Sequence, residues 1–342
     1  MAHMNNQSAP FLYSYKGEII MGGTAFKHLG YDSERMIASE FKQYEQEIVD
    51  ILDKLGIENY KIPYVKEKDS FGDIDIVVVK QSDVGIFDKI VENIELFGLT
   101  DDFVVRNKQF MSILYKQKYQ VDFIATSSDY AEYNVNYLSY NDLGNLIGRV
   151  IRESGFKHGH DGLYYVYREG NHYKQLIPLS KDYSKTLEIL GLDPSVFKKG
   201  FDTFTEMFEY VSSCKYFKKS RFDLENLNNR NRVRDRKRKV YNQFVNYVRD
   251  LEDSTQIIPS PFDIFPHLID ICFEIKKERS AYNKLKEVFN GQNIMKWTNL
   301  SGKELGNFIS LVKLHPDFDK RTQSIEDCEL FIKEEYFRRN VK

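Results

Sequence analysis

The strongest constraint on the fold is a short run of almost continuously β-branched residues, Ile74 to Val79, that follows two acidic side chains. Such a run predicts a strand buried on both faces. Asp73 and Asp75 stand two positions apart at its start, and residues two apart in a strand point to the same face. Ionised carboxylates placed side by side repel each other. A divalent cation bound between them, most naturally Mg²⁺, removes that repulsion.

A third carboxylate, Asp122, lies within a second apolar segment, Gln120 to Ile124. If the two strands are neighbours, the three carboxylates form a triad. Such a triad can hold two Mg²⁺ ions, or Mn²⁺ in their place, and these clamp the attacking and leaving oxygens of a displacement at phosphorus. Asp122 would also help to deprotonate the attacking hydroxyl.

An isolated Asp-x-Asp is more often a turn or a cap pair, so the residues around it decide between the two interpretations. Ser70 and Gly72 precede the pair and supply a hydroxyl and a flexible backbone. Burying an acidic side chain beside an apolar strand costs free energy unless the carboxylate is paired or binds a metal ion. We therefore interpret Asp73, Asp75 and Asp122 as catalytic, metal-binding residues.

The pattern along the chain predicts an α+β fold: an N-terminal domain with a short mixed sheet and flanking helices, then a mainly α-helical region. We expect a flexible N-terminus, residues 1–16, whose Met1-Ala2-His3 is consistent with a cloning remnant. An α/β domain at 17–132, a helical middle domain at 133–254 and a C-terminal helical domain at 255–342 should follow. The predicted helices are 33–55, 86–97, 140–153, 181–190, 201–213 and 230–251, and the predicted strands are 60–65, 74–79, 103–115, 119–125, 163–168 and 172–177.

Composition bounds the setting in which the protein works. The 49 basic and 51 acidic residues give a net charge of -2, which neither requires nor excludes a nucleic-acid partner. No apolar run is long enough to cross a membrane, and no signal peptide is recognisable. The three cysteines lie far apart without metal-ligand spacing, so we expect no structural zinc and a reducing, cytoplasmic location. The His158 loop, 155–162, is more typical of a plain loop than of a metal site.

Two further segments carry potential nucleic-acid contacts. The first is the basic stretch 230–239, whose density of one charge is what binding to a phosphate backbone requires; the alternative is a solvated face paired with acidic residues of the same protein. Its apolar residues, Val233 included, are expected on one helical face. The second is a turn at Gly302 and Lys303, where a helix N-terminus suits a phosphate, although an ordinary helix–turn–helix junction explains it equally well. The residues predicted to bind nucleic acid are Arg232, Arg234, Arg236, Lys237, Arg238, Lys239, Gly302 and Lys303.

The segments Met21-Gly22-Gly23-Thr24, Gly72-Asp73-Ile74-Asp75 and Gln120-Val121-Asp122 together resemble the polymerase-β-type nucleotidyltransferase superfamily, and most of all its viral and bacteriophage members. The resemblance covers about residues 17–130. The Gly302 turn loosely resembles a tRNA-contacting turn of CCA-adding enzymes, and the superfamily also includes poly(A) polymerases. In this chain 50 positions separate Gly23 from Asp73, further apart than in the usual family pattern.

The resemblance implies a nucleoside triphosphate substrate such as ATP, and a location in the host cytoplasm if the protein is encoded by a phage. By this resemblance Gly22, Gly23 and Ser70 would face the triphosphate, although a tight turn explains Gly22-Gly23 equally well. The residues themselves add Thr24 as a candidate helix N-cap, Gly72 beside the acidic pair, and Lys108, whose charge would neutralise the triphosphate. For Lys108 a solvated strand edge is the more frequent role. The expected reaction adds nucleotides to the 3′ end of an RNA, with tRNA as one candidate, and releases pyrophosphate. Two alternatives stay open: transfer to a protein or small molecule, and an inactive nucleic-acid-binding module. Basic charge lining the cleft would favour RNA.

Overall fold

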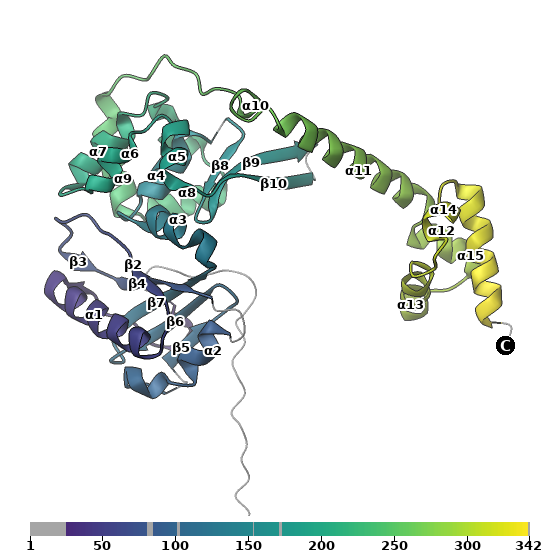
Figure 1. Ribbon diagram of the computed structural model, residues 1–342, viewed down its shortest axis with the longest axis horizontal. Helices are drawn as coiled ribbons and strands as arrows, with labels where there is room; N and C mark the ends of the chain where they lie inside the picture. The colour runs from purple at the N-terminus through teal and green to yellow at the C-terminus, as the bar shows by residue number, and fades with distance from the viewer. Residues whose placement is uncertain (1–24, 81–84, 101–102, 153, 171–172, 341–342) are drawn as a thin grey trace, which may run out of the picture. The chain divides into compact units, whose positions relative to one another are not determined.

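The computed structural model describes residues 25–80, 85–100, 103–152, 154–170 and 173–340. The chain divides into two compact units, with the division between Pro261 and Phe262. The expected α+β fold is confirmed: a small mixed sheet lies near the N-terminus and a helical region follows (Figure 1). Within the described residues, no helix combines the length and the hydropathy needed to cross a lipid bilayer.

The first unit is built on a five-stranded sheet with the strand order β2-β4-β7-β6-β5. Strands β4 and β7 are parallel and the other neighbouring pairs are antiparallel, so the sheet is mixed. A separate two-stranded ribbon joins β1 and β3. The bounds are β1 Met36–Ile37, β2 Asn59–Lys61, β3 Ser70–Phe71, β4 Asp73–Val79, β5 Val104–Arg106, β6 Phe110–Tyr115 and β7 Tyr119–Thr126.

The two faces of this sheet serve different purposes. Ile74, Ile76 and Val78 of β4 belong to a buried apolar cluster that also contains residues of α1 (Ala38–Lys54) and α2 (Ile86–Val91). Because side chains alternate along a strand, Asp73 and Asp75 point to the opposite face. Helix α3 (Ser128–Leu138) contacts β4 and β7, and Figure 1 shows it across the sheet from α1. The acidic pair therefore faces the helical part of the unit.

The remainder of the first unit combines helices with a second, antiparallel sheet of the order β10-β9-β8. Its strands are β8 Phe156–Gly159, β9 Gly162–Glu169 and β10 Tyr173–Ser180. The helices are α4 Leu143–Val150, α5 Tyr183–Ile189, α6 Pro194–Lys199, α7 Phe204–Ser212, α8 Asn229–Arg236 and α9 Lys239–Tyr247, and α10 Pro261–Ile264 lies at the division between the units.

The second unit is helical and has a small core of its own. Its helices are α11 Leu268–Val288, α12 Gly291–Thr298, α13 Gly302–Val312, α14 Phe318–Arg321 and α15 Ile325–Asn340. The buried residues of this core include Ile294 of α12, Val312 of α13 and Phe331 of α15. A core separate from that of the first unit is what an independently packed helical unit requires.

Several element boundaries differ from the sequence prediction. The first helix begins at Ala38, and Ser33 is not its N-cap, because Met36 and Ile37 pair with β3 instead. The predicted stop at Gly56 is confirmed, since that residue adopts a left-handed φ of 62° directly after the helix. The 163–177 hairpin is also confirmed, but β8 adds a third strand where a plain loop was expected.

The predicted helices at 140–153 and 230–251 are wrong in detail. The first is α4 alone, and α3 precedes it unpredicted because its Asn- and Tyr-rich sequence has low helix propensity. The second is broken at Lys237 and Arg238 into α8 and α9. Val233, expected on a continuous apolar face, is 53% exposed because the helix ends three residues later.

His158 lies on β8 as a core residue, and this placement predicts a pH dependence of stability. Its ring contacts those of Tyr133, Tyr137 and Tyr183. Burial lowers the pKa of His158 from 6.5 to about 4. Between these values the unfolded chain binds a proton that the native protein does not, so stability falls as the pH falls.

We expect the free energy of unfolding to drop by about 2 kcal/mol more in the wild type than in His158→Phe between pH 7 and pH 5. Urea denaturation of both proteins at the two pH values measures this difference. Because all other titrating groups are shared, they cancel in the comparison. Equal pH dependence of the two proteins would contradict the burial of a neutral histidine.

Candidate active site

The parallel pairing of β4 and β7 brings the three predicted carboxylates together. The register sets Asp75 opposite Asp122 and Asp73 opposite Gln120, so all four side chains lie on one face. One carboxylate oxygen from each of Asp73, Asp75 and Asp122 lies within 4.8 Å of the others. Within the described residues, this is the one group of three potential metal-ligating side chains that comes so close.

Asp122 is the most deeply placed of the three, with 2% of its surface exposed. Its carboxylate is held by a neighbouring amide: Nε2 of Gln120 donates to both Oδ1 and Oδ2, each at 2.9 Å. The Oε1 atom of Gln120 in turn accepts a hydrogen bond from the backbone N–H of Ala25 at 3.0 Å. These contacts fix the orientation of Asp122 toward the other two carboxylates.

The electrostatics of the triad disfavour three ionised carboxylates. Burial raises the pKa of Asp75 well above its usual value, and the charges of Asp73 and Asp122 raise it further. Burial and the charge of Asp73 also raise the pKa of Asp122, while hydrogen bonds from the side chains of Ser112 and Gln120 oppose the rise. Like charges at this distance in a poorly solvated site are unfavourable unless a cation or a proton compensates them.

The donor set fits a hard divalent cation. All three side chains offer carboxylate oxygens, which Mg²⁺ and Mn²⁺ prefer. In addition, Oδ1 of Asp75 is buried and makes no hydrogen bond to any described residue. An oxygen atom left without a partner in such a place is costly, and coordination to a cation would satisfy it. The triad could therefore hold a metal ion.

A cavity of about 330 Å³ opens beside Asp73. Its wall comes from both parts of the first unit: the segments before β1, β3 and β4 on one side, and the α3–α4 connection with the start of α9 on the other. Four cationic and two acidic side chains line it, so cations are in excess, as a polyanionic ligand requires. The lining residues are Arg35, Lys68, Gly72, Asp73, Asn141, Asp142, Arg238, Lys239 and Val240.

Arg35 is fixed against the strand that leads into the acidic pair. Its Nε donates to Oγ of Ser70 at 2.8 Å, and its Nη2 donates to the Ser70 carbonyl oxygen at 2.9 Å. The guanidinium also lies against Gly72, where an added Cβ would come within 3.0 Å of Nη1. Gly72 therefore leaves room for the Arg35 guanidinium in this position, and Ser70 holds it there.

Lys68 is the second cation near the carboxylates. Its Nζ lies 4.3 Å from the centroid of the Phe71 ring. Burial lowers the pKa of Lys68, whereas the charges of Asp73 and Asp75 raise it. The ammonium group thus lies within electrostatic reach of the triad and at the wall of the cavity. A charge in that place can contact an anionic group of a ligand that also approaches the metal site.

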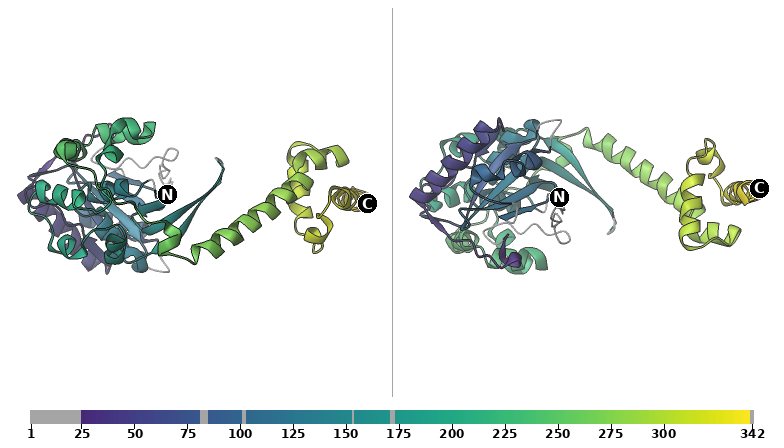
Figure 2. Two further views of the ribbon diagram at one scale, coloured as in Figure 1. Left: turned by 90° about the horizontal axis from the view of Figure 1, so that it is seen from above. Right: turned by 90° about the horizontal axis from the view of Figure 1, so that it is seen from below.

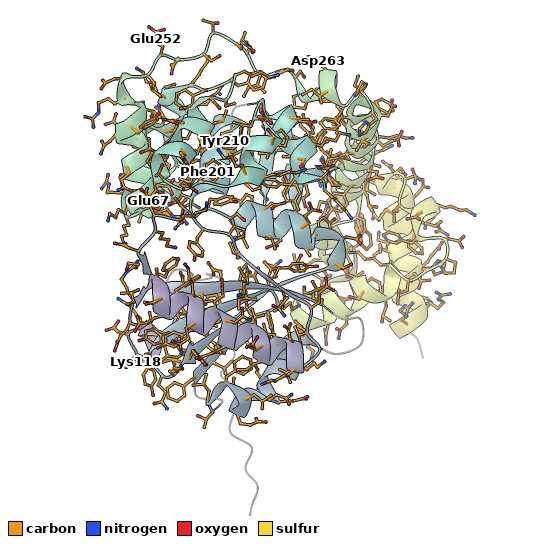
Figure 3. The ribbon with its side chains drawn as sticks, turned by 60° about the vertical axis from the view of Figure 1, so that its left-hand side comes forward. Glu67, Lys118, Phe201, Tyr210, Glu252 and Asp263 are labelled. Carbon is orange, nitrogen blue, oxygen red and sulfur yellow. The ribbon has the colours of Figure 1, made fainter. Side chains whose placement is uncertain are left out.

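The loop that precedes this lysine is joined to the helical part of the unit. The backbone N–H groups of Lys66 and Glu67 donate to the carbonyl oxygens of Phe201 and Asp202, at 3.2 and 2.9 Å. In Figure 3, Glu67 and Phe201 lie where the sheet domain meets the helices above it. These backbone hydrogen bonds join the two parts of the unit that form the walls of the cavity.

The opposite wall is formed by a strained turn and a broken helix. Tyr140 and Asn141 both adopt left-handed φ angles, 58° and 64°, which are uncommon for residues other than glycine. The turn directs Asn141 and Asp142 to the cavity. Asp142 pairs there with the guanidinium of Arg238, the residue at which the helix is interrupted.

The predicted triphosphate-binding residues have different outcomes. Gly22, Gly23 and Thr24 lie outside the described residues, although Ala25, which follows them, is linked through Gln120 to Asp122. Ser70 and Gly72 lie beside Arg35.

Lys108, expected within a strand, is instead exposed in the turn between β5 and β6. The backbone carbonyl oxygen of the adjacent Gln109 accepts a hydrogen bond from the N–H of Ala125. Ala125 lies near the C-terminal end of β7, beyond Asp122. The structure does not bring Lys108 to the cavity wall.

The basic segment 230–239 separates into structural and exposed residues. Arg234 donates to Asp235 and to Asn145, each at 2.8 Å. Arg232 donates to the carbonyl oxygen of Leu227 at 3.3 Å. Arg236, Lys237 and Lys239 are exposed, and Arg238 and Lys239 reach the cavity. Internal pairing with acidic residues is thus confirmed for Arg234 and Arg238, and nucleic-acid binding by the exposed residues stays a prediction.

Gly302 and Lys303 belong to the second unit. Gly302 is the first residue of α13 and has a left-handed φ of 54°, and Lys303 is exposed beside it. The turn between α12 and α13 exists as predicted, with Asn299 also left-handed. Its role in binding nucleic acid stays a prediction.

Sequence reasoning missed Arg35, Lys68, Asn141 and Asp142 as cavity residues. Lys68 had one signal, its position directly before the acidic segment. Arg35 and Asn141 had none, since only the folded chain brings them to Asp73. Comparisons of the chain with protein-family models and with curated proteins found no match.

Proposed function

We propose that the protein is a metal-dependent nucleotidyltransferase. The observation that carries this proposal is the convergence of Asp73, Asp75 and Asp122 within 4.8 Å on one face of two parallel strands. Divalent cations bound there would neutralise a triphosphate and lower the pKa of an acceptor hydroxyl. The substrate is a nucleoside triphosphate, and the acceptor is the 3′ end of an RNA.

The cavity beside the triad supports a triphosphate substrate. Arg35 and Lys68 supply positive charge from the sheet side, and Lys239 supplies it from the helical side, where Arg238 is paired with Asp142. Cations on both walls would hold the phosphate chain while Asp73, at the cavity wall, faces it. Basic charge at the cleft also favours RNA over an uncharged small molecule as the acceptor.

The reaction is a displacement at the α-phosphorus. The acceptor 3′-hydroxyl oxygen forms the new bond to phosphorus, and the bond to the oxygen bridging the α- and β-phosphates breaks. The electron pair of that bond leaves with pyrophosphate. The hydroxyl proton passes to a carboxylate of the triad; we assign this role to Asp122, and its fixed orientation against Gln120 supports the assignment.

Incubation with each α-labelled nucleoside triphosphate, Mg²⁺ and a pool of cellular RNA tests the proposal. We expect label in RNA and release of pyrophosphate, with neither product in EDTA. Label found only in protein or in a small molecule would replace RNA as the acceptor. No labelled product with RNA, protein or small-molecule acceptors would overturn the nucleotidyltransferase proposal.

Replacement of Lys68 by methionine is expected to raise the KM for the nucleoside triphosphate by about 10-fold or more. Loss of one charge-assisted contact removes about 1.5–3 kcal/mol of binding free energy, and methionine keeps the apolar stem over Phe71. Steady-state kinetics at saturating RNA measures the change. The matched control is Lys66→Met: Lys66 is exposed and pairs with Asp202, so its KM should stay within twofold of the wild type. Equal effects of the two substitutions would contradict a role for Lys68 at the phosphates.

A further inference from the structure

The small sheet β8-β9-β10 has one buried and one exposed face. The residues on its inner face that are buried include Phe156, His158, Leu163, Tyr167 and Ile177. Side chains alternate along a strand, and directly opposed residues of antiparallel strands share a face. The outer face therefore carries Lys157, Tyr164, Val166, Arg168, Lys174 and Leu176. We call this set the basic face.

Three cations gather on the basic face without acidic partners. Arg168 on β9 stands directly opposite Lys174 on β10. Partial burial lowers the pKa of Lys174, and the charges of Arg168 and Lys157 lower it further. Among the described residues, no acidic side chain forms an ion pair with any of the three. Like charges directly opposed across strands are destabilising. The repulsion between Arg168 and Lys174 therefore lowers the stability of the fold, which favours a role for these charges in binding a ligand.

The basic face also offers a surface for bases. Tyr164 lies beside Lys157, whose Nζ is 5.6 Å from the centroid of the tyrosine ring. Both strands β9 and β10 have eight residues, and Figures 1 and 2 show them extending beyond the helices α3 to α9 of the first unit. A row of cations with an aromatic ring on an extended sheet is the pattern that binds single-stranded nucleic acids. A small anion would need fewer charges, gathered in a pocket.

We propose that the basic face binds the phosphate backbone of single-stranded RNA. Arg168 and Lys174 contact one part of the phosphate backbone, Lys157 contacts it further along, and Tyr164 offers a stacking surface for a base. The role of this RNA as the acceptor rests on the function proposed above, but its binding does not. The surface is separate from the cavity, because no cavity-lining residue belongs to it.

Fluorescence anisotropy with a 5′-fluorescein-labelled 20-nucleotide oligouridylate tests the proposal. The full-length protein is compared with the triple variant Lys157→Gln, Arg168→Gln, Lys174→Gln at several KCl concentrations. We expect the Kd to rise at least tenfold at 100 mM KCl. The slope of log K against log[KCl] should shrink by about 2, since each phosphate contact on a single strand contributes about 0.7.

The matched control removes three exposed lysines elsewhere in the same unit: Lys42→Gln, Lys54→Gln, Lys198→Gln. It has the same net charge as the test variant, and we expect its Kd to stay within twofold of the wild type. Equal weakening in both variants, or no weakening in the test variant, would overturn the proposal. Nucleotide and divalent cations are omitted, so a failure of the transferase proposal does not alter this result.

The single variant Lys174→Gln provides a second readout. Removal of one of two opposed charges should raise the midpoint of thermal unfolding in the absence of RNA, while RNA binding weakens by at least twofold. A higher unfolding midpoint together with weaker RNA binding would support a role of Lys174 in binding RNA rather than in stabilising the fold. A lower unfolding midpoint, or unchanged binding, would contradict it.

Discussion

Replacing Asp75 with asparagine is expected to lower kcat/KM for nucleotide incorporation by about a thousandfold and to stabilise the metal-free protein. Loss of a metal ligand removes several kcal/mol of transition-state stabilisation, and each 1.36 kcal/mol is a factor of ten in rate. The stability gain has a separate cause. Burial and two neighbouring carboxylates raise the pKa of Asp75, so a neutral side chain of the same shape relieves an unfavourable charge.

Thermal unfolding in EDTA measures this gain, which should amount to about 2–4 °C for each kcal/mol of relieved repulsion. Mg²⁺ should raise the unfolding midpoint of the wild type and have little effect on the variant. The control is Asp69→Asn, which changes an exposed carboxylate on the same segment. We expect this variant to keep the kcat/KM and the unfolding midpoint of the wild type. An active Asp75→Asn protein would remove the basis for placing catalysis at this site.

Replacing Arg149 with methionine is expected to destabilise the protein by about 3–5 kcal/mol. The Arg149 guanidinium pairs with Asp235, and the side chains are only 5% and 0% exposed. Without the arginine, Asp235 remains buried and keeps one ion pair, with Arg234. At about 2–4 °C for each kcal/mol, the unfolding midpoint should fall by roughly 10 °C.

The double variant Arg149→Met, Asp235→Leu measures the interaction energy between the two side chains. Because both charges are gone, the loss should be much smaller than the sum of the single substitutions. The exposed Lys66–Asp202 pair serves as the control, and Asp202→Asn should change stability by less than about 1 kcal/mol. Additive losses in the double variant would contradict an energetic coupling between Arg149 and Asp235.

The core of the candidate site was predictable because it depends on local rules. Alternation along a strand set Asp73 and Asp75 on one face, and the apolar run that follows them identified a buried strand. The parallel register that places Asp122 beside Asp75 was only a hypothesis from the sequence, and the structure confirms it.

The cations of the cavity were not predictable, because long-range contacts place them. Arg35 reaches the site through its hydrogen bonds to Ser70, 35 positions further along the chain. Arg238 reaches it because the helix breaks at that residue, although the segment contains neither glycine nor proline. Local propensity carries no information about either contact.

The roles of the individual residues in the basic segment 230–239 were also not predictable from the sequence. Charge density alone gave all its residues one role, whereas Arg234 is engaged with Asp235 and Asn145. The basic face of the small sheet is the reverse case. Lys157, Arg168 and Lys174 are scattered in the sequence and form a cluster only after the strands pair.

The most direct test of the central claim is a crystal structure of the protein soaked with Mn²⁺ and a non-hydrolysable nucleoside triphosphate analogue, with anomalous scattering data. We predict anomalous peaks bounded by the carboxylates of Asp73, Asp75 and Asp122, for two ions about 3.5–4 Å apart. The phosphates should lie against Arg35 and Lys68. Bound analogue with no anomalous density at the three carboxylates would contradict the account.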